Sequence, residues 1–299
     1  FDGMTLRRGK IDAEILEKCK KLKVISRHGV GYDNVDTKFL KKNNITLLVT
    51  ATTTSVSPAE HIMFMILNIS KGIDFYDKAV RSGKFESIMH MKNNNNFELA
   101  NKKILIIGFG RIGRKLIKRC LGFEMKVYAY DPYVDQKTIE SFGGIKVNNL
   151  NDGLKEADVL SLSVPLTETT RNMINSEKIK MMKKSAIIIN TSRGGVVNEK
   201  DISEALDKKI IYGAGLDVFE KEPPDTDDPL LPMDNVILTP HALAWTDQLF
   251  ASIGRSVIES VLAVKRGTIP ENTVNREVLQ TSRFQEKMER YRLQFSQNS

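Results

Sequence analysis

The sequence contains few of the residues that build disulfide frameworks or metal sites. It holds two cysteines among 299 residues, Cys19 and Cys120, and they show neither metal-ligand spacing nor a disulfide pattern. Their scarcity predicts no metal site and fits a reducing cytoplasm, where we expect the protein to be located. No apolar run reaches the ~18 residues of a membrane helix, so no membrane span is predicted.

The beginning of the chain lacks an initiator methionine, a signal peptide and a transit-like segment. It opens with "FDGMTLRRGK", so we expect the native N-terminus to lie upstream of Phe1.

The basic residues are not gathered into one stripe. The formal net charge is +8, but the lysines are scattered through segments such as "KCKKLK", "FLKK" and "MMKK", and no nucleic-acid-binding motif is present. We therefore expect no nucleic-acid partner and interpret the charge as solvated surface, which would also attract small anionic ligands.

What the sequence does have is a regular alternation of strand-like and helix-like segments. Apolar residues make up 41% of the chain and charged residues 27%, which suits a globular protein. Short apolar, β-branched runs predict strands at 103–110, 126–131, 158–164, 186–190, 212–218 and 235–239. Helical patterns separate them at 111–121, 151–157, 176–182 and 199–209. This alternation predicts an α/β fold, a Rossmann-type doubly wound parallel sheet.

Two further parts of the chain frame this alternation. An apolar stretch at 57–83, with Pro58 in its first turn, predicts one long helix, and "MKNNNNF" at 91–97 predicts a loop. The first fifty residues form a separate pattern of strands at 22–27 and 45–50 around a helix at 35–43. We expect a smaller domain formed by 1–53 and 247–299, and a dinucleotide-binding domain at 54–246.

A glycine-rich turn lies between the first predicted strand of the larger domain and its helix. Gly108, Gly110 and Gly113 form a GxGxxG, and Asp131 ends the next strand. Gly108 allows a tight turn, Gly110 lets a pyrophosphate approach, and Gly113 lets helix and strand pack closely. The helix N-terminus attracts phosphates. Asp131 would bind ribose hydroxyls and repel a 2′-phosphate, which predicts NAD rather than NADP. The alternative is a tight turn that binds no ligand.

The chain has only four histidines, which limits the candidates for proton transfer. His28 adjoins "GVG", His61 lies in the apolar helix and His90 lies in a polar segment, so we interpret these three as structural. His241 differs because it follows the strand "NVILT", at the edge where doubly wound sheets bind ligands.

Two charged side chains are predicted at the same edge as His241. Glu222 lies in the acidic turn after the strand within "GAGLDVFEKEPP", and Arg193 follows the strand "AIIIN". Taken alone, the acidic turn reads as ordinary surface. A carboxylate beside an imidazole, however, fixes its tautomer and favours its protonated form, and an arginine binds and polarises a substrate oxygen. We therefore predict Arg193, Glu222 and His241 as catalytic residues.

These motifs resemble the D-isomer-specific 2-hydroxyacid dehydrogenase family over nearly the whole chain. The likeness rests on "GFGRIG", "SVPLTETT", "NTSRGGVVNE", "GLDVFEKEPP" and "LTPHALAWT", with "LKVISRHGVGYDNVD" before them and "ENTVNREVL" after them. It implies Arg193 as the carbonyl-binding arginine and Glu222 with His241 as the acid–base pair. It also implies a smaller, discontinuous flavodoxin-like α/β substrate domain and a homodimer built around the long helix.

The same resemblance implies the ligand contacts. Besides the glycine-rich turn, the NAD contacts are expected at Arg111, Ile112, Asp131, Val164, Pro165, Thr191, Ser192, Asp217 and Ala244. The substrate contacts are expected at Arg7 and at the backbone N–H groups of Val30 and Gly31.

The resemblance leaves the substrate and the role open. It implies hydride transfer between NAD and C2 of a D-2-hydroxy acid or 2-keto acid, with 3-phosphoglycerate, hydroxypyruvate or glyoxylate as candidate substrates. Members of the family normally begin with further strands and helices before the equivalent of Phe1, so the substrate domain is expected to be truncated. Two alternatives are an NAD-sensing corepressor on the same scaffold and a catalytically silent fragment.

Overall fold

The computed structural model describes residues 1–7, 9–50, 55–90, 96–242 and 245–297. The chain divides into two compact units. The smaller unit contains Phe1–Thr54 and Trp245–Ser299, and the larger unit contains Ser55–Ala244. Each unit is described by itself below.

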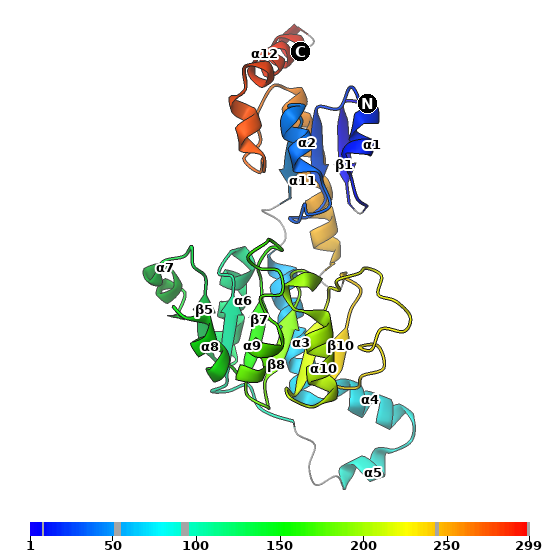
Figure 1. The fold of residues 1–299 in the computed structure, drawn as a ribbon, viewed down its shortest axis with the longest axis vertical. Coiled ribbons are helices and arrows are strands. Elements are labelled where there is room, and N and C mark those ends of the chain that lie inside the picture. Colours follow the sequence, from blue (N-terminus) through cyan, green and yellow to red (C-terminus); the bar gives the residue numbers. More distant parts are fainter. Residues whose placement is uncertain (8, 51–54, 91–95, 243–244, 298–299) are drawn as a thin grey trace. The chain divides into compact units, whose positions relative to one another are not determined.

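The larger unit is built on a seven-stranded parallel sheet (Figure 1). Its strands, in the spatial order β10-β9-β8-β7-β4-β5-β6, wind outward in both directions from β4. Their bounds are β4 (Lys103–Ile107), β5 (Lys126–Tyr130), β6 (Ile145–Lys146), β7 (Val159–Leu162), β8 (Ile187–Asn190), β9 (Gly213–Leu216) and β10 (Val236–Leu238). This strand order is that of the dinucleotide-binding Rossmann fold.

Two hydrophobic cores cover the faces of this sheet. On β4, Ile104 and Ile106 pack on one side and Leu105 and Ile107 on the other, because side chains alternate along a strand. The first core contains α3 (Val56–Lys71) and α6 (Arg111–Gly122), and the second contains α8 (Leu150–Glu156), α9 (Ser176–Met181) and α10 (Glu199–Asp207). Complete burial of one such isoleucine stabilises the fold by about 1.5–3 kcal/mol. A small edge helix, α7 (Gln136–Ser141), precedes β6.

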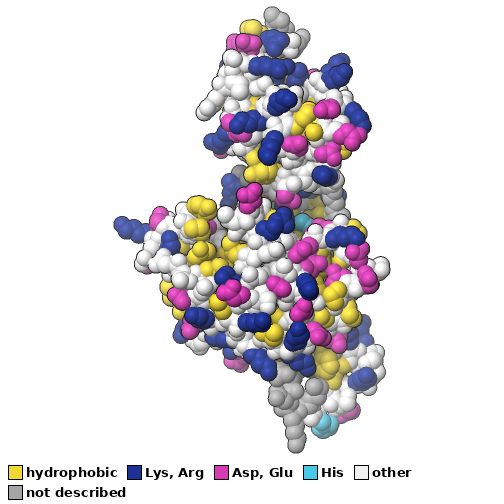
Figure 2. Space-filling view, in the orientation of Figure 1, with side chains coloured by type: hydrophobic (Ala, Val, Ile, Leu, Met, Phe, Trp, Pro, Cys, Tyr) yellow, Lys and Arg dark blue, Asp and Glu magenta, His cyan; other side chains and the backbone are white. Residues whose placement is uncertain are grey.

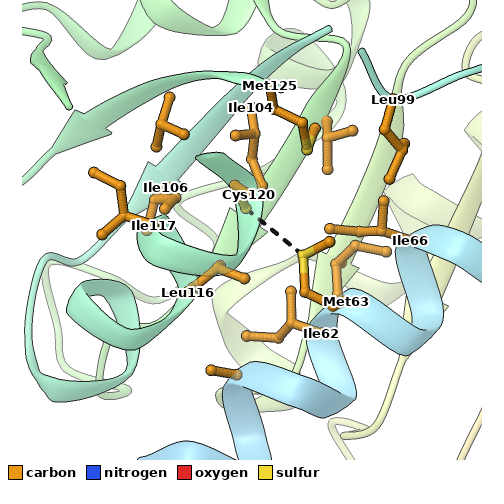
Figure 3. Packing of buried hydrophobic residues seen from close by; sticks show 14 of the residues in the cluster. Ile62, Met63, Ile66, Leu99, Ile104, Ile106, Leu116, Ile117, Cys120 and Met125 are labelled. Atoms are coloured by element: carbon orange, nitrogen blue, oxygen red, sulfur yellow. Dashed lines mark hydrogen bonds between the residues drawn. The ribbon is translucent and has the colours of Figure 1, made fainter. Parts of the chain in front are cut away.

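Figure 3 shows the first core, where α3 lies against α6. Met63 of α3 and Cys120 of α6 point toward each other, with their sulfur atoms 3.7 Å apart. Burial raises the pKa of the Cys120 thiol to about 12, so the thiol stays protonated. Cys120 therefore acts as a small apolar core residue, and both cysteines are free.

The single helix predicted over 57–83 is wrong. Gly72 adopts a left-handed conformation with φ of 60° and ends α3, and the chain continues as α4 (Ile73–Arg81) and α5 (Phe85–Met89). The left-handed conformation is easy for glycine, which has no Cβ, and it breaks the helix direction. In the predicted loop at 91–97, residues 91–95 lie outside the described residues, and the side chain of Asn96 donates to the carbonyl of Lys71 over 3.0 Å.

The smaller unit has a three-stranded parallel sheet of β1 (Gly3–Leu6), β2 (Val24–Arg27) and β3 (Thr46–Val49). Its helices are α1 (Ala13–Lys18), α2 (Thr37–Lys42), α11 (Asp247–Lys265) and α12 (Ser282–Gln297), with a 3-10 turn at Arg276–Gln280. Asn275 joins the two chain segments, since its side chain accepts from the N–H of Leu47 and donates to the carbonyl of Ile45, both over 2.8 Å. The sequence patterns did not predict β1, α1 or α11.

The charges on the surface are mixed. Figure 2 shows lysine and arginine side chains interspersed with aspartate and glutamate on the visible face, without one continuous basic stripe. In the part of the chain that the structure describes, no helix is both long enough and apolar enough to cross a membrane.

Candidate active site

The carboxyl ends of five neighbouring strands lie level with one another. The last residue of each strand is the register partner of the last residue of the next strand. Across the sheet these residues are Ile107, Leu162, Asn190, Leu216 and Leu238. The segments that follow these residues therefore leave the sheet at one edge, the edge where parallel sheets of this kind bind ligands.

The glycine-rich turn between β4 and α6 is closely packed. Gly108 has φ of 92°, and a Cβ there would lie 2.5 Å from the carbonyl oxygen of Ser163. A Cβ on Gly113 would lie 2.5 Å from the carbonyl oxygen of Gly108, whereas one on Gly110 would meet nothing within 4 Å. Only Gly110 faces open space, as the approach of a pyrophosphate requires, and Arg111 and Ile112 begin the helix directly after it.

Asp131 lies beside this turn at the end of β5. Its Oδ2 accepts from the N–H of Phe109 over 2.8 Å, and its Oδ1 accepts from the N–H of Tyr133 over 2.9 Å. A carboxylate has about four lone-pair sites, so these two bonds orient Asp131 and leave capacity for hydroxyl donors. The turn and the carboxylate together fit an adenosine diphosphate-ribose group.

Asn190, which the sequence motifs did not single out, shapes the segment after β8. Its Oδ1 accepts from the N–H and from the hydroxyl of Ser192, over 3.1 and 2.8 Å, and its Nδ2 donates to the carbonyl of Arg193 over 2.8 Å. Thr191, Ser192 and Arg193 are all half-buried. The only signal in the sequence was a polar residue at the end of a buried apolar strand. On the neighbouring β7, Val164 and Pro165 follow the strand end at the same edge.

The segment that carries Arg193 lies directly against the segment that carries Glu222. A Cβ on Gly194 would lie 2.0 Å from the carbonyl carbon of Phe219 and 2.3 Å from the backbone nitrogen of Glu220. Since no real Cβ tolerates such distances, glycine is required for the two backbones to touch. The charge of Arg193 contributes to the lowered pKa of Glu222, which places both side chains in one electrostatic site.

Glu222 and His241 form a hydrogen-bonded pair of a carboxylate and an imidazole. The Nδ1 of His241 lies 2.8 and 3.0 Å from the two carboxylate oxygens of Glu222, and each side chain is 39% exposed. Burial alone raises the pKa of Glu222, but the hydrogen bond and charge of His241, the N–H of Phe219 and the charge of Arg193 outweigh it and lower the pKa. The carboxylate is therefore charged at neutral pH and holds Nδ1, which leaves Nε2 for a ligand.

Two further glutamates, Glu199 and Glu220, stabilise the turn that contains Glu222. Glu199, the first residue of α10, accepts from the N–H of Glu220 over 2.7 Å, and Glu220 accepts from the N–H of Glu199 over 3.0 Å. Burial, with the charges of Asp228 and Glu220, raises the pKa of Glu199. This reciprocal bonding fixes the turn at Glu220, two residues before Glu222.

Asp217 follows β9 directly and is almost completely buried. Its Oδ1 accepts from the hydroxyl of Thr239 over 2.6 Å and from the N–H of Ala242 over 3.3 Å. Asp217 therefore accepts hydrogen bonds from residues on both sides of His241 in the chain. Ala244, also expected near the cofactor, lies outside the described residues.

The predicted substrate contacts belong to the smaller unit. The guanidinium of Arg7 lies 4.4 Å from the ring centroid of Trp245 and 5.4 Å from that of Phe250. Val30, which is exposed, and Gly31, which is half-buried, follow β2, and within the described ranges no hydrogen bond uses their N–H groups. Both features suit the binding of an anionic ligand.

Residues 63–242 match the family described as D-isomer specific 2-hydroxyacid dehydrogenase, NAD binding domain. The chain belongs to this family. The prediction of a D-2-hydroxyacid dehydrogenase family and of NAD as its cofactor is confirmed by this match.

Known relatives agree with this assignment. The chain is 40% identical over 275 residues to the D-3-phosphoglycerate dehydrogenase of Methanocaldococcus jannaschii, covering 92% of this chain and 52% of that protein. It is 37% identical over 276 residues to the glyoxylate reductase of Korarchaeum cryptofilum, covering 92% of this chain and 83% of that protein. The chain thus spans about half the length of the first relative and most of the second.

Solved structures confirm the predicted α/β fold class. The D-lactate dehydrogenase from Aquifex aeolicus, complexed with NAD and lactic acid, superposes with a TM-score of 0.84 at 32% identity and covers 91% of this chain and 86% of that chain. The match thus includes residues of both units of this chain.

Proposed function

We propose that this chain catalyses reversible hydride transfer between NAD and C2 of a D-2-hydroxy acid or 2-keto acid. The observation that carries the proposal is the His241–Glu222 pair, held at 2.8 Å on the strand edge that also bears the glycine-rich turn and Arg193. When bound, NADH supplies the hydride, and the chain supplies substrate binding and the proton.

In this proposal Arg193 binds the substrate. Its planar guanidinium offers paired donors to a carboxylate or carbonyl oxygen, so it both orients the substrate and polarises the bond that is reduced. Asn190 holds the backbone of Arg193 and thereby limits the positions that the guanidinium can reach.

His241 is proposed as the proton donor during reduction. Nδ1 is engaged by Glu222, so Nε2 carries the proton that passes to the substrate oxygen. Glu222 stabilises the imidazolium before transfer, and Arg193 stabilises the developing negative charge on the oxygen. In the oxidative direction the neutral imidazole accepts the proton at Nε2.

For the substrate, we propose a small 2-keto acid such as glyoxylate or hydroxypyruvate, with 3-phosphoglycerate as the competing candidate. The small 2-keto acid is supported by relatives named glyoxylate reductase, at 34–38% identity, and hydroxypyruvate reductase, at 39%. Relatives named D-3-phosphoglycerate dehydrogenase, at 36% and 40% identity, support the competing candidate. Arg7, Val30 and Gly31 are proposed as contacts of the substrate carboxylate or of a second anionic group.

The experiment is a panel of substrates with the full-length gene product. Glyoxylate, hydroxypyruvate, pyruvate and larger 2-keto acids are assayed with NADH, and 3-phosphoglycerate is assayed with NAD. Turnover of at least one of these that is lost in the His241→Gln variant supports the proposal. Absence of turnover on every substrate, with normal NADH binding, contradicts it and favours a sensing role.

We also propose that the protein is a cytoplasmic homodimer. Large apolar side chains on α3–α5 are about half exposed or more, which is unusual for the surface of a monomer. They are Phe64, Ile73, Phe75, Val80, Phe85 and Met89. Figure 1 shows α4 and α5 extending beyond the helices that cover the sheet. Light scattering of wild type and of Phe75→Lys tests the dimer, which the charged variant should dissociate.

A further inference from the structure

A second histidine–carboxylate contact lies buried beneath the edge that bears His241. His61, on α3, has its Nε2 3.8 Å from Oδ1 of Asp217, and the two side chains are only 2% and 5% exposed. The same Nε2 lies 3.5 Å from the hydroxyl of Thr239. The sequence predicted His61 as a structural residue of an apolar helix. Its polar partners, Asp217 and Thr239, follow the carboxyl ends of β9 and β10.

These partners are the residues that hold the His241 segment. Asp217 Oδ1 accepts from the hydroxyl of Thr239 over 2.6 Å and from the N–H of Ala242 over 3.3 Å. The N–H of His241 donates to the carbonyl of Thr239 over 3.0 Å, and His241 itself has φ of 52°. A non-glycine residue in this region requires that its neighbours define the backbone conformation.

The bonds assign a direction to the network. Because the Thr239 hydroxyl donates to Asp217, its oxygen is free to accept from His61, so Nε2 of His61 carries the hydrogen. Burial lowers the pKa of His61, and the charge of Asp217 offsets this only in part. The imidazole is therefore neutral, and a chain of donors runs from His61 through Thr239 to the Asp217 carboxylate.

Packing alone does not account for a histidine here. The Nδ1 atom of His61 is buried and has no hydrogen-bond partner among the described residues. An unsatisfied buried polar atom costs stability, whereas leucine or methionine of similar volume would fill the same space without that cost. The neighbouring buried positions on α3 are apolar, including Ile62 and Met65.

We propose that His61 is a positioning residue of the active site: as a neutral donor it fixes Thr239 and Asp217, and through them the segment that presents His241. The proposal rests on the function proposed above, in which His241 transfers the proton. It adds a residue of α3, remote in sequence, to the residues that set the reaction geometry.

The test compares two substitutions at His61 with one control. His61→Leu removes the donor and the unsatisfied Nδ1, and His61→Gln keeps an N–H donor at the position of Nε2. Met63→Leu changes another buried side chain of α3 that contacts Cys120 rather than Asp217. For each variant, kcat, the KM for keto acid, the dissociation constant for NADH and the melting temperature are measured.

The expected result separates activity from stability. His61→Leu lowers kcat by about two- to tenfold, the range that one intramolecular hydrogen bond supports, while its melting temperature stays equal or rises. His61→Gln restores most of kcat, and Met63→Leu leaves kcat unchanged. If kcat and melting temperature fall together and glutamine restores neither, the role of His61 is structural and the proposal is overturned.

A second readout does not depend on turnover. The ¹⁵N imidazole signals of His241, identified by their loss in His241→Gln, report its contact with Glu222. We expect these signals to move or broaden in His61→Leu and to return in His61→Gln. Unchanged signals in His61→Leu overturn the positioning role. A wild-type protein inactive on all keto acids contradicts the proposed function, while the signals still decide the role of His61.

Discussion

Two histidine–carboxylate pairs lie at the same end of the larger sheet, and they differ in nearly every physical respect. His241 and Glu222 are each 39% exposed and 2.8 Å apart, whereas His61 and Asp217 are 2% and 5% exposed and 3.8 Å apart. In the exposed pair the carboxylate binds the imidazole directly. In the buried pair the closest bond of the carboxylate, 2.6 Å, goes to Thr239.

The difference shows how surroundings assign tasks to identical groups. Burial raises the pKa of the Glu222 carboxyl, but the hydrogen bond and charge of His241, the N–H of Phe219 and the charge of Arg193 together hold this pKa below its usual range. Around His61, burial dominates and lowers the imidazole pKa. A pair that can hold and release a proton suits catalysis, and a neutral imidazole that cannot easily be charged suits a fixed scaffold.

The largest loss of activity is expected when the histidine of the exposed pair is replaced. His241→Gln removes the proton donor and should lower kcat/KM for keto-acid reduction by about 10²–10⁴, the usual contribution of general acid catalysis. His61→Gln should stay within about tenfold of wild type. Steady-state kinetics with NADH and the best keto acid of the panel measure both. Equal losses in the two variants would refute the division of tasks.

The next effect concerns the cation beside the exposed pair. Arg193→Lys keeps a charge but loses the paired donors, and we expect kcat/KM to fall by about 10²–10³. NADH affinity measured by titration without substrate, and the melting temperature, should change little. A well-folded Arg193→Lys protein with near-native kcat/KM would remove Arg193 from the site.

A third carboxylate, that of Asp131, differs from both pairs because it accepts hydrogen bonds from backbone N–H groups instead of contacting an imidazole. In the proposed NAD site Asp131 would lie at the ribose hydroxyls, where a like charge of a 2′-phosphate at ~4 Å costs about 1 kcal/mol in water and about 4 kcal/mol near a protein surface. We therefore expect kcat/KM with NADH to exceed that with NADPH by about tenfold or more. Asp131→Asn should reduce this preference, whereas Asp135→Asn, which changes the cap of α7, should not. Equal use of both cofactors by wild type contradicts the role of Asp131.

Some of this site could be predicted from the sequence because its determinants are local. The glycine-rich turn joins a strand to the next helix, and Asp131 ends the following strand, so spacing along the chain is enough. Arg193, Glu222 and His241 were placed at one edge because parallel strands share their carboxyl ends. The structure brings Glu222 and His241 into direct contact. The distance between the two side chains could not be predicted from spacing along the chain.

The remaining features depend on contacts between distant segments. Gly194 looks like any glycine until the backbone of Phe219 is seen against it. His61 lies on a periodic apolar helix, and its partners Asp217 and Thr239 come more than 150 residues later in the chain. The helix end at Gly72 was not predicted from the sequence. A single glycine within an apolar helical pattern is tolerated inside many helices, whereas in others it adopts a left-handed conformation and ends the helix.

The measurement that tests the central claim most directly is the pH profile of keto-acid reduction in Glu222→Gln. The lowered pKa of Glu222 keeps its carboxylate charged through the neutral range, and that charge is lost only as the pH falls through this lowered value. Above it, the negative charge of the carboxylate stabilises the positive imidazolium that donates the proton, and the neutral amide of glutamine does not. The profile of kcat/KM should shift to the acid side in Glu222→Gln but not in Asp225→Asn, a carboxylate of the same turn that pairs with Lys221. A Glu222→Gln profile that keeps the wild-type position and height would contradict the account.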